Sequence, residues 1–344
     1  MKEAFHIERG IDTFCLCSIL SNSQKKGILR YLRKREKFFT TSDSDYWTDK
    51  SKYRCNCFEE DGIKLELSNW NRDGNGGWNL FVRIKPALIL GLEPWALYRP
   101  NKSSYRQLMN RADLLLSTVG IHESIKTMSI CRIDVTENQC YDVQEDVMQH
   151  LRLLKKSMIP AKYEQMWFSG DGSTVKDAKA ANKHSYKLQC KSTAFFVYDK
   201  TAQLQMIDRF PRSVESQHIL RLEVQMNRKA MLKKIGSCKS QFQELKACAQ
   251  SAEKIIRWFL KRLQPRCQQT VRYADAIALV SAVRKESKRE RMLYLLRKTS
   301  DSDNLSNALE KLKEHFQLSP GQCWNVLKSF EKLGISPITL PNTV

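Results

Sequence analysis

Three short segments limit the possible folds of this chain more than any other feature, because each alternates its side chains with the period of a β-strand. They are Ser129–Thr136, Ala194–Lys200 and Ile219–Met226. Successive side chains of a strand point to opposite faces, so each segment has one face that carries chemically capable residues. Those faces hold Arg132, Asp134 and Thr136, then Phe196, Tyr198 and Lys200, and then Arg221, Glu223 and Gln225. We predict that the three strands belong to one sheet and that these faces converge.

The other patterns in the first part of the chain indicate an α+β fold. Gly10–Leu20 is predicted to be the first strand, and Ile63–Trp70 and Trp78–Lys85 are predicted to form a hairpin. The Asp-Gly and Gly-Gly steps in Asn71–Gly77 supply the positive φ angles that a hairpin turn needs. Gly170–Lys191 is rich in Lys, Ser, Gly and Asn, which favours a basic loop or hairpin.

Two helices are predicted among these strands. One begins at an N-cap, Ser103 or Ser104, and runs to Thr118. The other covers about Asp142–Lys156, and its apolar stripe begins at Val143.

From about Gly236 the pattern becomes helical throughout. The fold class we predict is therefore α+β, with a central, mainly antiparallel sheet flanked by helices in residues 1–235, followed by an all-helical C-terminal domain in residues 236–344. The last helix has clear boundaries, with Ser319 as N-cap, Pro320 in the first turn and Gly334 after its end. The expected C-terminal helices are Ser240–Leu263, Gln268–Val283, Glu286–Arg297, Asn304–Phe316 and Pro320–Leu333.

The charge of the chain is strongly unbalanced, since 58 Lys and Arg against 37 Asp and Glu give a net charge of +21. Such a field attracts polyanions, most simply nucleic acid, and an anionic membrane surface is the alternative. No run approaches the roughly 18 apolar residues that span a bilayer. The N-terminal residues also lack the pattern of a secretory signal. We therefore expect a cytoplasmic protein without a membrane partner.

The eleven cysteines do not form a recognisable motif. Cys15 with Cys17 and Cys55 with Cys57 are C-x-C pairs, but no C-x-x-C occurs and no Cys/His group has zinc-ligand spacing. This usage favours reduced, partly buried thiols in a reducing compartment.

The residues on the three strand faces suit chemistry on a phosphodiester. The pKa of a free tyrosine is about 10, so Tyr198 would attack phosphorus only with help from a cation or base, and Lys200 is placed to give it. Asp134 and Glu223 offer hard oxygen ligands for Mg²⁺ or Mn²⁺.

Two arginines complete this set, and each member of it also has a simpler interpretation. Arg132 or Arg221 could bind a phosphate through two parallel hydrogen bonds. Equally, the R-x-D and R-x-E pairs could form cross-strand ion pairs without a metal. A strand tyrosine is commonly half-buried with its hydroxyl hydrogen-bonded.

In order and spacing, CRIDVT, FFVYDK and ILRLEVQM resemble the motifs of the gene II/X replication initiation proteins of filamentous phages. These proteins are rolling-circle replication endonucleases, which nick one strand of the duplex replicative form. The resemblance also takes in Gly10–Leu20, Phe81–Gly91 and, less distinctively, Cys323–Ile335, so it covers most of the chain. This chain reads Gly91-Leu92-Glu93 where the family often has Gly-x-Asn, and it is shorter than the coliphage relatives.

The resemblance implies a site-specific single-strand DNA endonuclease and strand transferase of the rolling-circle initiator nuclease type. Tyr198 falls on the family's nucleophile, Asp134 and Glu223 fall on its acidic motifs, and Asp12 sits at its N-terminal acidic position. The implied product is a 5′-phosphotyrosyl link with a free 3′-OH. The implied partners are double-stranded origin DNA, single-stranded DNA, and a host helicase and polymerase in the bacterial cytoplasm, with no small-molecule substrate.

Under this interpretation residues 1–235 are catalytic, and residues 236–344 bind DNA or regulate. The run Arg284–Arg291 is either a solvated helix face or a phosphate contact. The candidate phosphate-binding residues outside the strands are Lys191, Arg284, Lys285, Lys288 and Arg289.

Three other functional classes stay open from the sequence. A non-catalytic DNA-binding replication regulator explains the charge but leaves the strand-borne acids without a role. A metal-independent tyrosine recombinase requires Arg and His residues around a helical tyrosine, whereas Tyr198 lies in a strand-like segment beside acids. An RNA-binding protein fits the charge, but the aromatic motifs of the usual RNA-binding modules are not visible.

Overall fold

The computed structural model describes residues 3–35, 38–43, 50–69, 77–166, 182–206, 218–263, 269–301 and 304–341. The chain divides into two compact units, and each unit is built from separate stretches of sequence. Unit 1 comprises Met1–His6, Gln139–Leu222 and Arg257–Val344, and unit 2 comprises Ile7–Asn138 and Glu223–Ile256. Strands β6 and β10 and helix α9 each contribute residues to both units.

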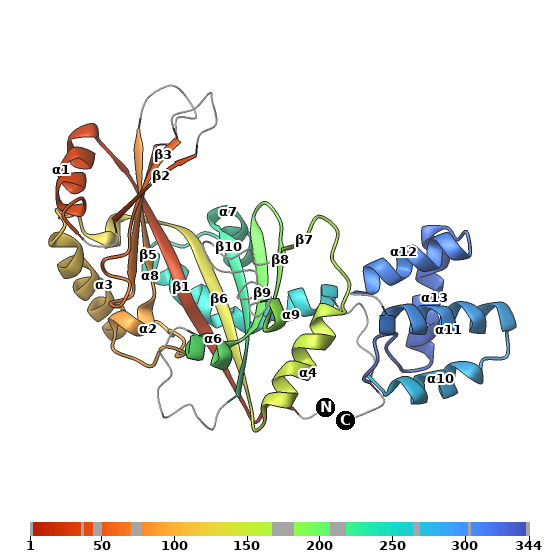
Figure 1. Ribbon diagram of the computed structural model, residues 1–344. Helices are drawn as coiled ribbons and strands as arrows, with labels where there is room; N and C mark the ends of the chain where they lie inside the picture. The colour runs from red at the N-terminus through yellow and green to blue at the C-terminus, as the bar shows by residue number, and fades with distance from the viewer. Residues whose placement is uncertain are drawn as a thin grey trace. The chain divides into compact units, whose positions relative to one another are not determined.

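Unit 2 is a sheet with helices (Figure 1). Its strands follow the order β2-β3-β4-β5-β1-β6-β10, and each of the pairs from β2 to β1 is antiparallel. The strands are β1 (His6–Leu20), β2 (Phe38–Asp43), β3 (Lys50–Cys55), β4 (Ile63–Asn69), β5 (Trp78–Ile84), β6 (Ser129–Tyr141) and β10 (His218–Asn227). The helices are α1 (Asn22–Leu32), α2 (Pro86–Ile89), α3 (Lys102–Ser117), a 3₁₀ turn at Ile125–Thr127, α7 (Arg228–Ile235), α8 (Gln241–Gln250) and the start of α9 (Ala252–Leu263).

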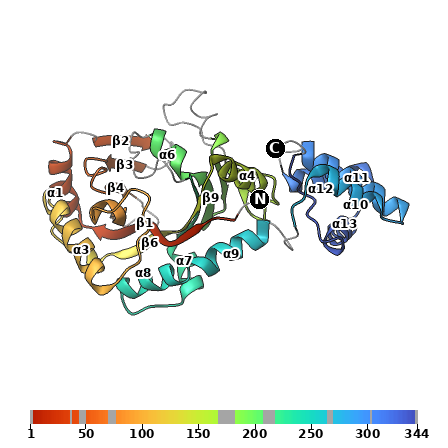
Figure 2. The same ribbon diagram turned by 90° about the horizontal axis from the view of Figure 1, so that it is seen from below.

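The strands of unit 2 alternate between a fully buried face and a more open face. In β5, Leu80, Val82 and Ile84 are completely buried, whereas Arg83 between them is exposed. On β1, Phe14 lies opposite Ile84 and is also completely buried, so neighbouring strands share one apolar layer. Helix α8 lies beside β1 and β6 in both views (Figure 2).

Unit 1 contains a smaller group of strands and most of the C-terminal helices. The strand order is β10-β9-β8-β7, and the β8–β9 and β7–β8 pairs are antiparallel. The strands that lie wholly in this unit are β7 (Glu164–Met166), β8 (Ser185–Gln189) and β9 (Thr193–Asp199). The helices are α4 (Gln144–Lys155), α6 (Lys200–Met206), the end of α9, α10 (Tyr273–Ser281), α11 (Glu286–Asp301), α12 (Leu305–His315) and α13 (Pro320–Lys332).

Helices α10 to α13 pack around a hydrophobic core of their own. Met292 and Leu295 of α11, Leu312 of α12 and Phe330 of α13 are buried in it. Helix α13 begins as predicted, because Ser319 caps it with a reciprocal pair of hydrogen bonds to Gln322 and Pro320 occupies its first turn. The capping residues fix where the helix begins, and the buried apolar stripe fixes which face of it packs against the core.

The predicted α+β class with a mainly antiparallel sheet is confirmed, and the predicted strands Gly10–Leu20, Ser129–Thr136 and Ile219–Met226 lie within β1, β6 and β10. The hairpin strands are present as β4 and β5, and its turn at Asn71–Gly77 lies largely outside the described residues. The same holds for much of Gly170–Lys191. The predicted division at residues 235 and 236 falls within unit 2, so the compact units follow other boundaries.

Several predicted helix details were wrong. The N-cap of α3 is Asn101, because its side chain accepts from the Ser104 backbone amide at 2.9 Å, while the Ser104 side chain accepts from the Asn101 amide. Val143 precedes α4 and is exposed, since the helix begins only at Gln144. The long helix predicted for Ser240–Leu263 is two helices, because α8 ends at Gln250 with Ser251 as its C-cap and α9 begins at Ala252.

We predict that Phe330→Ala destabilises the α10–α13 helices by about 3–5 kcal/mol, because it leaves a cavity in their core. Hydrogen-exchange mass spectrometry of residues 305–332 should show faster exchange. Lys328→Ala on the exposed face of the same helix is the control and should change stability by less than about 0.5 kcal/mol. Equal effects of the two variants would contradict this description of the core.

Candidate functional site

The predicted acidic residues lie on three neighbouring strands of unit 2. Asp12 is on β1, Asp134 on β6 and Glu223 on β10, and these strands are adjacent in the sheet. All three residues are buried, and Asp134 has an exposed fraction of 0 %. An ionised carboxylate buried to this degree is costly unless it is paired. The partner of Asp134 therefore decides whether its charge can be kept.

That partner is Arg132, two residues earlier on the same face of β6. Its Nε donates to Oδ1 of Asp134 at 2.9 Å, and its Nη2 donates to Oδ2 at 2.7 Å. With its amide oxygen turned to the guanidinium, Gln225 of β10 accepts from Arg132 Nε at 3.0 Å. Burial lowers the pKa of Arg132, but the carboxylates of Asp134 and Glu223 outweigh this effect and raise it. The structure thus brings these residues of β6 and β10 into one charged cluster.

The surroundings of Asp134 disfavour the ionised form of its carboxyl group. Burial is the largest influence and raises the pKa of Asp134, and the nearby Asp12 carboxylate raises it further. The guanidiniums of Arg132 and Arg83 act in the opposite direction but do not cancel the shift. Additional positive charge beside these acids would relieve the repulsion between them.

The chemistry of the donor set fits a hard divalent cation. Asp12, Asp134 and Glu223 offer only carboxylate oxygens, which Mg²⁺ and Mn²⁺ prefer. Within the described ranges, no three His, Cys, Asp or Glu side chains are grouped closely enough to hold a metal ion. Arg132 engages both oxygens of Asp134, so a metal ion would have to share these oxygens with the guanidinium or displace it.

The predicted nucleophile lies at the end of β9 in unit 1. Tyr198 is half-buried, whereas Phe195 and Val197 on the other face of the strand are fully buried. The Lys200 ammonium lies 6.0 Å from the centroid of the Tyr198 ring and donates to Gln203 Oε1 at 2.7 Å. The phenol and a buried cation are therefore neighbours.

The prediction that the strand continues through Lys200 was wrong. Strand β9 ends at Asp199, and Lys200 is the first residue of α6. The cause is a helix cap, because Oδ1 of Asp199 accepts from the Ala202 backbone amide at 2.9 Å. Lys200 thus approaches Tyr198 through a strand-to-helix turn rather than through alternation along a strand.

Asp199 also organises a buried polar network that sequence reasoning missed. Its Oδ2 lies 3.2 Å from Nδ1 of His184 and accepts a short hydrogen bond from the Gln144 amide. Gln144 in turn meets His218 Nδ1 at 3.0 Å through its own oxygen. The signal for Asp199 was an acidic residue directly before a helix. His184 and His218 gave no local signal, because their partners lie elsewhere in the sequence.

The remaining predicted residues occupy different environments. Arg221 of β10 has the largest completely buried side chain among the described residues. Lys191 is exposed in the turn between β8 and β9. Arg284 and Lys285 are exposed just before α11, and Lys288 and Arg289 lie in its first turn. These four residues form a basic segment at the start of α11.

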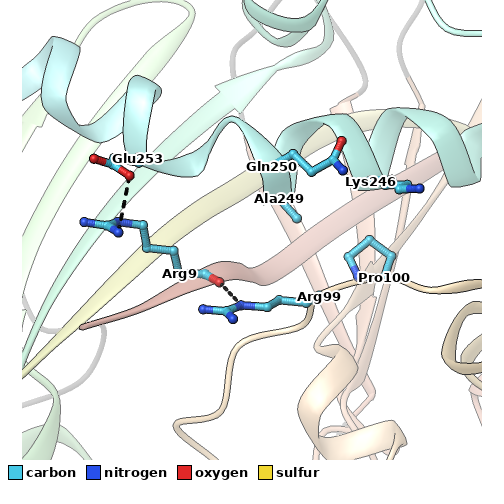
Figure 3. A pocket seen from close by; sticks show the side chains of 7 residues that line it. All are labelled: Arg9, Arg99, Pro100, Lys246, Ala249, Gln250 and Glu253. Atoms are coloured by element: carbon cyan, nitrogen blue, oxygen red, sulfur yellow. Dashed lines mark hydrogen bonds and ion pairs between the residues drawn. The ribbon is translucent and has the colours of Figure 1, made fainter. Parts of the chain in front are cut away.

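A basic pocket of about 390 Å³ lies elsewhere in unit 2 (Figure 3). Arg9, Arg99 and Lys246 line it together with one carboxylate, Glu253, so its wall is mainly cationic. Arg9 is held in place, because its Nε contacts Glu137 at 2.5 Å and its Nη1 contacts Glu253 at 3.4 Å. Arg99 donates to the Arg9 carbonyl oxygen at 2.6 Å. The pocket therefore offers a second region that attracts anions.

One thiol differs from the others in its acidity. Burial raises the pKa of Cys190, but hydrogen bonds from Thr193, Tyr163 and the backbone of Ser192 outweigh it, and the pKa falls to about 7. The Cys190 Sγ lies 3.1 Å from the Thr193 hydroxyl. By contrast, the pKa of Cys131 rises to about 12, chiefly through its hydrogen bond with Cys15.

Comparison with known proteins does not assign the chain to a family. No model of a known protein family matches it, and the curated proteins contain no significant match. Among the helices described by the structure, none combines the length and apolar character required to cross a membrane. The functional argument therefore depends on the residues themselves.

We predict that Arg132→Ala destabilises unit 2 by about 3 kcal/mol, because it leaves the buried Asp134 carboxylate without its main partner. The double variant with Asp134→Asn should recover part of that loss in a thermal unfolding measurement. The matched control is Arg54→Ala, which breaks the exposed Arg54–Glu66 pair at 3.0 Å and should cost less than about 1 kcal/mol. A purely additive double variant would show that the two side chains are not coupled.

We predict that Cys190 reacts with iodoacetamide at a rate that rises with pH around a midpoint of about 7, since the thiolate is the reactive form. Thr193→Val should move the midpoint upward, because it removes a hydrogen bond that stabilises the thiolate. Peptide mapping would measure the rate, with Cys131 as the unreactive control. A wild-type midpoint near that of a free thiol would contradict the hydrogen-bonded arrangement.

Proposed function

We propose that this protein is a rolling-circle replication initiator, a site-specific single-strand DNA endonuclease and strand transferase. The observation that carries the proposal is the placement of three buried acids, Asp12, Asp134 and Glu223, on neighbouring strands of unit 2, where Arg132 interacts with Asp134 and Glu223 and Asp12 acts on Asp134. Buried acids of this number are expensive for stability alone, which argues for a role in chemistry. The motif resemblance and the net charge of +21 point to DNA as the substrate.

In the proposed reaction Tyr198 is the nucleophile. Its phenol oxygen forms a bond to the phosphorus of the scissile phosphodiester, and the bond from phosphorus to the 3′ oxygen breaks. The phenol proton leaves to solvent or a base, helped by the neighbouring Lys200 charge, and the departing 3′ oxygen takes up a proton. The products are a 5′-phosphotyrosyl link and a free 3′-OH, and the reverse reaction rejoins a strand.

The charged groups have distinct roles in this proposal. Asp134 and Glu223, with Asp12 as a third candidate, would hold Mg²⁺ or Mn²⁺, which would neutralise charge on the phosphodiester. Arg132 would bind a phosphate oxygen once it leaves Asp134. Arg221 is a weaker candidate for phosphate contact, because its side chain is completely buried.

The partners follow from the reaction and the charge. Double-stranded origin DNA and single-stranded DNA would be bound, a host helicase would unwind the duplex, and a host polymerase would extend the 3′-OH. Lys191, Arg284 and Lys285 are exposed and Lys288 and Arg289 are half-buried, so Lys191 and the basic segment at the start of α11 suit phosphate contact. The cationic pocket at Arg99 and Lys246 suits it as well. Binding should weaken steeply with salt, because each neutralised phosphate releases counterions.

A second candidate function is a DNA-binding replication regulator without cleavage. The observation that favours it is the bidentate ion pair, in which Arg132 donates to both oxygens of Asp134. In that case the acids would stabilise the sheet through their ion pairs and would not bind a metal cation. A covalent protein–DNA adduct that EDTA prevents would separate the two functions.

We predict that Tyr198→Phe abolishes nicking of supercoiled origin plasmid in Mg²⁺ and forms no covalent adduct. The matched control is Tyr186→Phe, since Tyr186 is a buried tyrosine of β8 whose hydroxyl has no hydrogen-bond partner among the described residues. That variant should nick normally and keep its stability. Nicking that survives in Tyr198→Phe would exclude this residue as the nucleophile.

We predict that Asp134→Asn and Glu223→Gln each lower the nicking rate by at least about 100-fold, because each removes a ligand charge. Origin binding in a filter assay without metal should stay within about threefold of the wild type, because no phosphate-binding cation is lost. Glu66→Gln, which changes a half-buried acid of β4 paired with Arg54, is the control and should retain full activity. Full activity in either site variant would remove that residue from the metal site.

A further inference from the structure

Helices α12 and α13 of unit 1 are joined in a way that bears on DNA recognition. The connection has only four residues, Phe316 to Ser319, between an 11-residue and a 13-residue helix. A connection of three or four residues between two such helices is the arrangement of a helix-turn-helix unit. The residues of the proposed catalytic site do not include this pair of helices, so the pair has no role in the proposed cleavage.

The turn is fixed by the backbone and by the core. Gln317 has a positive φ of 50°, which reverses the chain directly after α12. The Leu318 amide donates to the Lys313 carbonyl oxygen at 2.9 Å, and the Leu318 side chain is buried in the core of the α10–α13 helices. Ser319 then caps α13. These contacts hold α13 at a defined angle to α12 rather than on a flexible tether.

Helix α13 has one face in the core and one face in solvent. Cys323, Val326 and Phe330 are buried. Asn325, Lys328 and Lys332 are exposed, and their spacing of three and four residues places them in one row along the helix. Gln322 belongs to the helix cap, because its side chain accepts from the Ser319 amide at 2.8 Å. The exposed row is therefore accessible to a ligand.

The chemistry of this row matches the major groove of duplex DNA. Asn325 is an amide side chain of the kind that pairs with adenine through two hydrogen bonds, and Lys328 can donate to guanine or to a phosphate. The row contains no carboxylate, and Lys332 extends it with further positive charge. Trp324 at its edge keeps 38 % of its surface exposed, which offers an apolar contact to a thymine methyl group or a sugar.

We propose that α12 and α13 form a helix-turn-helix unit and that α13 enters the major groove of duplex DNA. Asn325 and Lys328 contact base edges, and Lys332 contacts the backbone. This deepens the proposed function and rests on it, since it assigns recognition of the double-stranded origin to a surface of unit 1. It also separates recognition of duplex DNA from the cleavage residues.

The test uses the full chain with Tyr198→Phe, so that binding is measured without cleavage. Duplexes of 30 random base pairs, flanked by fixed ends, are selected for binding, and the enriched sequence is then measured by fluorescence anisotropy. Asn325→Ala should lower affinity for the selected duplex by about 10-fold or more and leave affinity for a scrambled duplex within about twofold. Lys332→Gln should weaken both duplexes and reduce the slope of log K against log salt by about 0.9.

Matched controls are Asn110→Ala and Lys102→Gln, which change exposed residues of α3 in unit 2 and should leave both affinities unchanged. The proposal is overturned if no sequence is enriched from the duplex pool. It is equally overturned if Asn325→Ala binds the selected duplex as the wild type does, or if single strands of that sequence bind as tightly as the duplex. Nicking by Tyr198→Phe would instead count against the proposed nucleophile and leave this result standing.

Discussion

The ion pair between the half-buried Arg132 and the fully buried Asp134 is the interaction on which the charged part of unit 2 depends. A carboxylate with no access to water cannot stay ionised in a sheet unless a cation meets it directly. Arg132 meets both of its oxygens, at 2.9 and 2.7 Å, and Gln225 and Glu223 of the next strand surround the guanidinium. Strands β6 and β10 are thus joined by side chains as well as by their place in the sheet.

The same pair connects the stability of the fold with the proposed chemistry. The charges that the sheet pairs internally are those that a metal ion and a phosphate would compete for. In the proposed reaction Arg132 exchanges Asp134 for a phosphate, while a cation takes its place beside the acids. Because Asp12 and burial already raise the pKa of Asp134, the exchange would relieve repulsion that the fold has accumulated. Stability and reactivity would then draw on one set of residues.

Much of the local structure could be predicted because its causes lie between neighbouring residues. The period-2 pattern predicts β6 and β10, and the Ser-Pro start and Gly end predict α13. The prediction failed where more than one neighbouring residue could cap a helix. Asn101 rather than a serine caps α3, and Asp199 ends β9 by capping α6. The network of Asp199 with His184 and Gln144 could not be predicted, since it joins residues 15 and 55 positions apart.

The sequence by itself determined the strands that carry the candidate acids, the last helix, the excess of positive charge and the identity of the acidic residues, because periodicity, caps and charge are properties of the chain alone. Only the tertiary structure decided that Asp134 is fully buried and held by Arg132, that Lys200 reaches Tyr198 from a helix, and that Asn325, Lys328 and Lys332 face solvent while Phe330 does not. The physical reason is that desolvation and pairing depend on atoms brought together from distant positions. No local sequence pattern shows which charged side chain will be desolvated in the fold.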